Sequence, residues 1–212
     1  MPEEIASARF HEVGWRVLAY AASVHFRTAS FAEGIRLADA IGGLADDTGH
    51  RAHLDLRATG LTVRLPVNGE GRLTDDDVVL AGRISASAAD LGAKADVAGL
   101  QMTQIAIDAL VIPDIMPFWA AVLGYETLGD TLIDPDYEGP TVWFQPMDAP
   151  RPERNRIHID VYVPADRAEA RIAAALNAGG RIVYDDRAPL WWTLADPEGN
   201  EVDVASWPDM DD

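Results

Sequence analysis

The stretch RIHIDVYVPADRAEARIAAALNAGG, residues 156–180, sets the pattern of the second half of the chain. Residues 156–163 alternate between apolar and polar side chains, which predicts a strand. Residues 165–180 have helical spacing and end in Gly-Gly, a common helix stop. The segment QIAI at 104–107 aligns with HIDV at 158–161, an offset of about 54 residues. The sequence therefore predicts an internal duplication.

Each copy of the duplication has the order strand, helix, and three strands. The first copy has strands at 102–112, 126–134 and 139–147, with a helix over 113–125 that ends near Gly124. The second copy places its later strands at 181–186, 191–196 and 201–206. Turn residues separate these strands, as in a β-α-β-β-β module.

The first half of the chain has a different rhythm. A helix is predicted from the possible N-cap Ser30 to Gly49, and a second from Thr74, which lies three residues before Asp77 in a near capping box. Alternating segments at 14–31 and 53–67 predict strands, with a bend or bulge at 59–60 that fits two strands or one interrupted strand. The small, Ala/Gly-rich stretch 87–101 indicates a helix end followed by a linker. We therefore predict two domains, at 1–95 and 100–212.

Composition excludes several classes of function. The net charge is −18, and residues 99–212 carry 21 acidic against 7 basic residues. An acidic surface repels the phosphate backbone of nucleic acids, and we therefore expect no nucleic-acid partner. No apolar run is long enough for a membrane span, no secretory signal is visible, and there is no cysteine for a disulfide or a thiolate ligand. A cytoplasmic location is the expectation.

Three motifs in the second half occur in a characteristic order: FWAAVLGY at 118–125, NRIHID at 155–160 and DPEGN at 196–200. With these motifs, residues 100–207 resemble the glyoxalase-like branch of the vicinal-oxygen-chelate superfamily, which includes glyoxalases, bleomycin-resistance proteins and extradiol dioxygenases. The resemblance implies two βαβββ modules that curl around one cleft. Active members hold a divalent metal there, with ligands from the first and last strands of each module.

Carried over to this chain, the ligand positions fall near Gln104, near Gln145 or Trp143, at His158 and at Asp203. Only His158 and Asp203 are good metal ligands, because glutamine is a weak neutral donor. Glu201 lies two residues from Asp203, on the same side of the strand, and is a spare carboxylate. We therefore expect a cleft without a metal and no cofactor, with a divalent metal as the alternative.

Trp191 and Trp192 are adjacent on a predicted strand, so they point to opposite faces. One is expected to pack in the core, and the other to line the cleft as a stacking surface for a planar ligand.

The first half carries a second resemblance. Its residues are Gly14-Trp15, Phe26, Phe31, the helix Ala38 to Ala45, His50, Leu61-Thr62-Val63, and LTDDDVVLA at 73–81. With them, residues 12–88 resemble pterin-4a-carbinolamine dehydratase. The resemblance implies an α+β fold with an antiparallel sheet that carries helices on one face, and loss of water from a 4a-hydroxytetrahydropterin.

Dehydration needs an acid and a base, and imidazole suits both roles at neutral pH. The family has two adjacent histidines followed by Pro and an acid, with a third histidine after the next strand. Here the stretch is His50-Arg51-Ala52-His53, and the third position is Asn68. An arginine cannot act as a base, and an asparagine can hydrogen-bond a substrate without transferring protons. His53 could replace a histidine only if a turn separates it from His50, because residues three apart on a strand face opposite ways.

The other uses of these histidines are weaker. His50 and His53 have HxxH spacing, but no nearby cysteine or third histidine completes a metal site. His11 and His25 lie near apolar strand material and are expected to be packing or surface residues.

Three functions remain open at this point. The first is an enzyme, either a lyase of the pterin dehydratase type or a metal-dependent glyoxalase or dioxygenase. The second is a binding protein for a small, planar, cationic ligand, which fits the acidic second half with Trp191, Trp192, Glu201 and Asp203. The third is a role in protein interaction. The family that the first domain resembles self-associates, so a homo-oligomer is expected.

Overall fold

The computed structural model describes residues 7–150 and 158–206. The chain divides into two compact units, residues 1–102 and 103–212. No helix among the described residues is both long and apolar enough to cross a membrane.

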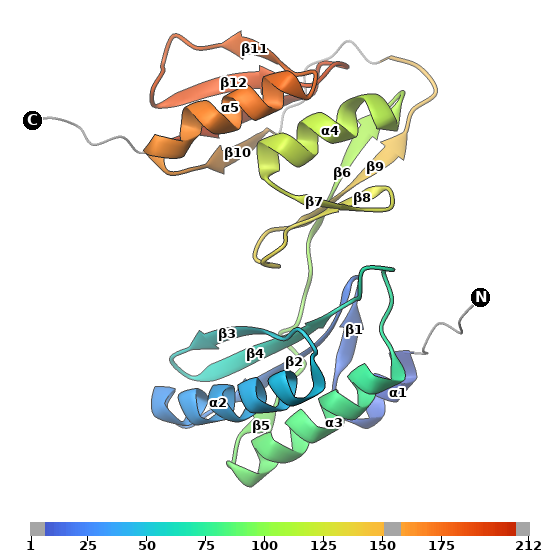
Figure 1. The fold of residues 1–212 in the computed structure, drawn as a ribbon, viewed down its shortest axis with the longest axis vertical. Coiled ribbons are helices and arrows are strands. Elements are labelled where there is room, and N and C mark those ends of the chain that lie inside the picture. Colours follow the sequence, from blue (N-terminus) through green and yellow to red (C-terminus); the bar gives the residue numbers. More distant parts are fainter. Residues whose placement is uncertain (1–6, 151–157, 207–212) are drawn as a thin grey trace, which may run out of the picture. The chain divides into compact units, whose positions relative to one another are not determined.

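The N-terminal unit is an antiparallel sheet covered by helices. Its strands are β1 (Arg16–Leu18), β2 (Ala21–Arg27), β3 (His53–Arg57), β4 (Gly60–Pro66) and β5 (Lys94–Ala95), in the order β1-β2-β4-β3 with β5 also paired to β2. The helices α2 (Phe31–Thr48) and α3 (Asp75–Asp90) lie on one face of the sheet, and α1 (Ser7–Glu12) packs beside β1 and α3 (Figure 1). Trp15, Phe26 and Ile41 are among the core side chains between the layers.

The predicted helix ends of this unit are confirmed. Ser30 accepts a hydrogen bond from the Glu33 N–H at the start of α2, and Gly49 ends it in a left-handed conformation. Thr74 and Asp77 form a complete, reciprocal capping box. The bend predicted at 59–60 proves to be a tight turn of residues 58 and 59, with Gly60 already in β4, so β3 and β4 are two paired strands. Within the stretch predicted as a linker, β5 forms and pairs with Phe26 and Arg27 of β2.

The C-terminal unit contains the predicted duplication. The first module is β6 (Gln104–Ala109), α4 (Ile112–Leu123), β7 (Glu126–Leu128), β8 (Thr131–Ile133) and β9 (Thr141–Pro146). The second is β10 (Ile159–Tyr162), the 3₁₀ turn η1 (Ala165–Arg167), α5 (Ala168–Asn177), β11 (Arg181–Tyr184), β12 (Trp191–Ala195) and β13 (Glu201–Ala205). The sheets have equivalent orders, β6-β9-β8-β7 and β10-β13-β12-β11, with the first strand parallel to the last. The α+β fold and the two βαβββ modules predicted from the sequence are therefore confirmed.

The two modules share one apolar core beneath α4 and α5, which pack on each other. Arg171 of α5 donates to the Val122 carbonyl near the end of α4, at 2.9 Å. The turn after β12 contacts the start of α4, because the Glu198 carboxylate accepts from the Leu110 and Val111 N–H groups. This carboxylate satisfies backbone donors that a helix start leaves unpaired. We call the face of each sheet that is turned away from these helices its open face.

Candidate functional site

The open face of the second module carries its polar residues. Ile159 and Val161 of β10 pack against the core, and the alternate residues Asp160 and Tyr162 are exposed. Successive side chains of a strand point to opposite faces, so Asp160 and Tyr162 share the open face with His158, which precedes the strand. On β13, Val202 and Val204 are buried, which places Glu201 and Asp203 on the same open face.

Three of these residues come together. Asp160 of β10 pairs with Asp203 of β13 across the parallel ladder. The His158 Nε2 atom lies 3.4 Å from Asp160 Oδ1 and 4.0 Å from Asp203 Oδ2. The side chains of His158 and Asp160 are about half exposed, whereas that of Asp203 is 21% exposed. The result is an acidic pair with one imidazole beside it.

This cluster fits a divalent cation in part. One ligand atom from each of His158, Asp160 and Asp203 lies within 4.8 Å of the other two. Imidazole and carboxylate groups are ordinary ligands of zinc and related metals, at bonds of about 2 Å. Small side-chain movements would therefore let the three residues hold a cation. Exposed acidic groups are also common without one.

The equivalent positions of the first module have poor ligands. Ala106 pairs with Trp143, just as Asp160 pairs with Asp203, so Trp143 rather than Gln145 is the counterpart of Asp203. Gln145 pairs with Asp108, two residues further along each strand. The Gln104 amide donates to the Thr141 hydroxyl at 3.0 Å. Among the described residues, the cluster of metal-ligating groups therefore lies in the second module.

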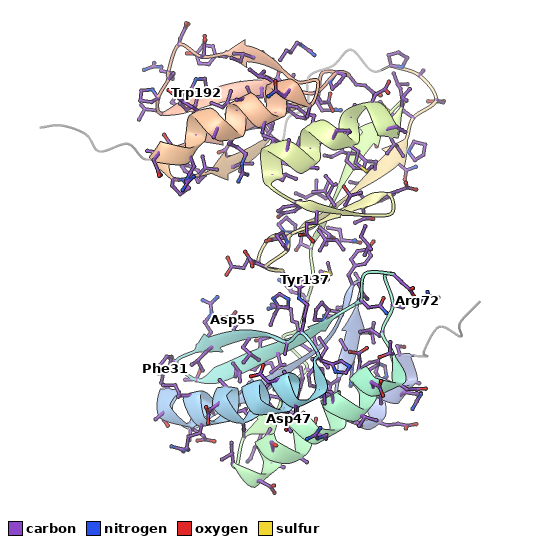
Figure 2. The ribbon with its side chains drawn as sticks, viewed as in Figure 1. Phe31, Asp47, Asp55, Arg72, Tyr137 and Trp192 are labelled. Atoms are coloured by element: carbon purple, nitrogen blue, oxygen red, sulfur yellow. The ribbon has the colours of Figure 1, made fainter. Side chains whose placement is uncertain are left out.

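The two adjacent tryptophans of β12 lie on opposite faces of the sheet. Trp192 packs against the core (Figure 2), and Trp191 lies on the open face. The Trp191 ring stacks with Tyr184, at 6.5 Å between centroids, and the Arg187 guanidinium lies 6.0 Å from its centroid. Thr193, two residues further along β12 on the same face, pairs with Asp203. An aromatic surface therefore lies one strand away from the acidic pair.

In the N-terminal unit, His50 contacts protein groups through both ring nitrogens. Its Nδ1 is 3.1 Å from the Thr48 carbonyl oxygen, and its Nε2 faces the Asp77 carboxylate at 3.6 Å. The other oxygen of Asp77 accepts from the Thr74 backbone and hydroxyl. A carbonyl partner requires the proton on Nδ1, which leaves Nε2 as the nitrogen that could reach a substrate. The Nε2 atom therefore faces Asp77, one of the two residues that form the capping box at the start of α3.

The other residues expected at a dehydratase site are spread over several elements. Arg51 is exposed in the loop after α2, and His53 opens β3 opposite Arg64. Asn68 lies in the loop between β4 and α3, where its side-chain oxygen accepts from the Glu70 and Arg72 N–H groups. Its amide oxygen is therefore engaged in building the loop.

Comparison with known proteins assigns both halves. Residues 1–87 match the family of pterin 4 alpha carbinolamine dehydratase, and residues 104–205 match the family described as a glyoxalase-like domain. The chain joins a pterin dehydratase-like domain to a glyoxalase-like domain. No curated protein matches it.

Solved structures resemble one domain each. A glyoxalase-related enzyme from Fulvimarina pelagi is 14% identical, with 51% of this chain and 88% of that one covered, at a TM-score of 0.40. A glyoxalase/dioxygenase from Nostoc punctiforme is 14% identical over 55% and 97%, at 0.41. A transcriptional coactivator/pterin dehydratase from Brucella melitensis is 17% identical over 41% and 99%, at 0.37.

Sequence reasoning missed three residues in these domains. Asp160 of the glyoxalase-like domain lies two residues after His158, and this spacing on a strand was the signal that both share a face. His25 of the pterin dehydratase-like domain, expected to be a packing or surface residue, lines a cavity of about 650 Å³. Burial raises the pKa of Tyr125, at the end of α4, above its ordinary 10.0, and the Asp134 carboxylate raises this pKa further. Neither the cavity position of His25 nor the raised pKa of Tyr125 has a local sequence signal.

Proposed function

We propose that the glyoxalase-like domain binds a small, planar, cationic molecule on the open face of its second module. The observation that carries the proposal is the side-by-side placement of Asp160 and Asp203, with one imidazole beside them. Two adjacent carboxylates repel each other, and a positive charge between them relieves the repulsion. A ligand cation would supply that charge.

The aromatic surface supports the planar part of the ligand. Trp191 already has a guanidinium beside its ring, from Arg187, so the ring accepts a cation in this setting. Arg187 and Tyr184 both come from the segment before β12, and a bound ligand would take the place of Arg187 over the indole. A cation that stacks on Trp191 would direct its charge towards Asp203, across the β12–β13 pair.

The acidic composition of the second half favours the same ligand. Residues 99–212 carry three times as many acidic as basic residues, 21 against 7. A negative potential over the domain attracts cations to its surface and repels anions. The acidic surface of this domain therefore supports a cationic ligand.

The test is a calorimetric titration of the full chain with N-methylquinolinium, a planar aromatic cation. Asp203→Asn keeps the size of the side chain and removes its charge, so we expect binding about tenfold weaker. Asp166→Asn, which changes a carboxylate that is 76% exposed next to Arg167, is the matched control and should bind as the wild type does. Equal affinity in all three proteins would contradict the proposal.

The second candidate function is a divalent-metal enzyme, favoured by the three clustered donor groups. His158, Asp160 and Asp203 would hold the ion, which would act as a Lewis acid towards a bound oxygen atom. Metal content by elemental analysis of untagged protein, followed by titration with Zn²⁺, Mn²⁺, Fe²⁺ and Ni²⁺, tests this candidate. A near-stoichiometric metal that is lost in His158→Ala would establish it and replace the cation proposal.

For the pterin dehydratase-like domain, we propose a folded domain without an efficient dehydratase site. Its surviving histidine, His50, faces Asp77, and Asn68 cannot transfer protons. A dehydratase assay with 4a-hydroxytetrahydropterin should show no difference between the wild type and His50→Gln. A rate that falls at least about a hundredfold in His50→Gln would assign general acid–base catalysis to this residue.

A further inference from the structure

The pterin dehydratase-like domain has a cavity on the sheet face opposite its helices. Val24 and Phe26 of β2 are buried beneath the helices, so the alternate residues His25 and Arg27 lie on the other face, with Thr62 of β4 opposite His25. The cavity, of about 650 Å³, is lined by His25, Arg27 and Thr62 together with Thr28, Thr59, Asp96, Gly99 and Leu100. His50 and Asn68 do not line it.

The segment after α3 completes the cavity. β5 pairs with Phe26 and Arg27, and the Asp96 N–H donates to the His25 carbonyl at 2.7 Å. The Asp96 carboxylate accepts from the Ala98 N–H at 3.0 Å and from Arg27 Nε at 2.6 Å. These hydrogen bonds hold the pKa of Asp96 below its ordinary 3.8. The carboxylate is thereby committed to holding the loop and the arginine.

The imidazole in the cavity is held in place. His25 Nδ1 lies 2.9 Å from the Thr62 hydroxyl oxygen. A Cβ at Gly60 would come within 2.5 Å of the His25 Cε1 and Nε2 atoms, so the ring lies directly against a backbone that has no side chain. The ring position therefore depends on glycine at residue 60.

Three threonines line the cavity, Thr28, Thr59 and Thr62. The Thr28 hydroxyl is buried on the side of α2, 3.7 Å from the position of a Cβ at Gly34, so it does not face the cavity. The hydroxyls of Thr59 and Thr62 line the same cavity.

Donors outnumber free acceptors in this cavity. Arg27 keeps N–H groups beyond those that contact Asp96, and imidazole and hydroxyl groups also donate. Among the described residues, one carboxylate lines it, and this group, Asp96, already accepts from Arg27 and Ala98. A donor-rich site that contains a guanidinium suits an oxyanion.

We propose that this cavity is a second ligand site, which binds the oxyanion, carboxylate or phosphate, of a small metabolite. The site uses the Arg27 guanidinium as its cationic donor, with the His25 imidazole and the hydroxyls of Thr59 and Thr62 as further donors. It is independent of the planar-cation site proposed for the glyoxalase-like domain, and its ligand has the opposite charge.

The test is NMR titration of the ¹⁵N-labelled full chain with inorganic phosphate and, separately, with succinate. Saturable shifts of the Thr28, Thr59 and Gly99 amides are expected for at least one of them, and the tighter of the two identifies the source of the oxyanion. Arg27→Gln should weaken this binding about tenfold or more. Arg72→Gln is the matched control, because Arg72 is also paired with an acid, Glu70, and does not line the cavity.

Three results would overturn the proposal. They are the absence of saturable shifts at these amides, equal affinities in the Arg27→Gln and Arg72→Gln proteins, and binding of glycerol, a neutral polyol, as tight as that of either anion. Thr62→Val supplies a second variant that keeps the arginine and the loop, and it should also weaken binding. The amide spectrum of each variant shows whether it is folded.

Discussion

The Trp119 indole N–H donates a hydrogen bond of 2.9 Å to the Asp196 carboxylate, and both side chains are buried. Trp119 comes from α4 of the first module, and Asp196 begins the DPEGN turn of the second. The same carboxylate accepts from the backbone N–H groups of Glu198, Gly199 and Asn200 and from the Asn200 side chain. One buried acid therefore shapes the turn and connects it to the helix of the other module.

Asp196→Ala should destabilise the glyoxalase-like domain. The substitution leaves the Trp119 N–H buried without an acceptor and releases the donors of the turn, so we expect the free energy of unfolding to fall by about 3 kcal/mol or more. Urea unfolding of the full chain, followed through the NMR signals of each domain, measures the change. The pterin dehydratase-like domain serves as the internal reference, and a loss under about 1 kcal/mol would show that the hydrogen bonds are not needed.

Two glycines of the pterin dehydratase-like domain should respond to alanine in opposite directions. At Gly60, a Cβ would meet the His25 ring at 2.5 Å and the Phe26 carbonyl oxygen at 2.8 Å, so Gly60→Ala should destabilise by about 1–3 kcal/mol. At Gly43, an exposed site within α2, a Cβ meets nothing within 4 Å, so Gly43→Ala should stabilise by about 0.5–1 kcal/mol. Urea midpoints of the two variants give the comparison. A stabilised Gly60→Ala protein would mean that the His25 ring moves freely.

Tyr125 should titrate above the ordinary range of tyrosines. Burial raises the pKa of its hydroxyl, with a further rise from Asp134, so the folded pKa exceeds the unfolded value of about 10. The stability that this group contributes is therefore complete below the unfolded pKa and is lost as the pH rises through the folded pKa. In an absorbance titration of the phenolate, Tyr125→Phe should remove a component above the ordinary range. Loss of a component within the ordinary range would contradict the assignment.

Much of the fold was predictable because its signals are local. The caps at Ser30, Gly49 and Thr74 depend on residues within one turn of a helix, and the helices begin and end there. The duplication was visible because QIAI and HIDV both alternate towards the same core. The opposite directions of Trp191 and Trp192 follow from strand geometry alone.

The site was harder to predict because it depends on pairing between distant strands. The register of β6 against β9 brings Trp143, and not Gln145, to the position of Asp203, and that register is set by the intervening α4, β7 and β8. The cavity at His25 needs β5, a strand of two residues within a segment whose small side chains indicate a linker. A strand of two residues is too short to show a hydrophobic periodicity.

The most direct test of the planar-cation site compares two ligands that differ in charge and little else. N-methylquinolinium is a planar cation, and quinoline has the same ring system but is neutral at neutral pH. Calorimetric titration of the full chain should show saturable binding of N-methylquinolinium at least about tenfold tighter than that of quinoline, because the Asp160–Asp203 pair attracts the charge. Equal affinities, or no binding of the cation, would contradict the account.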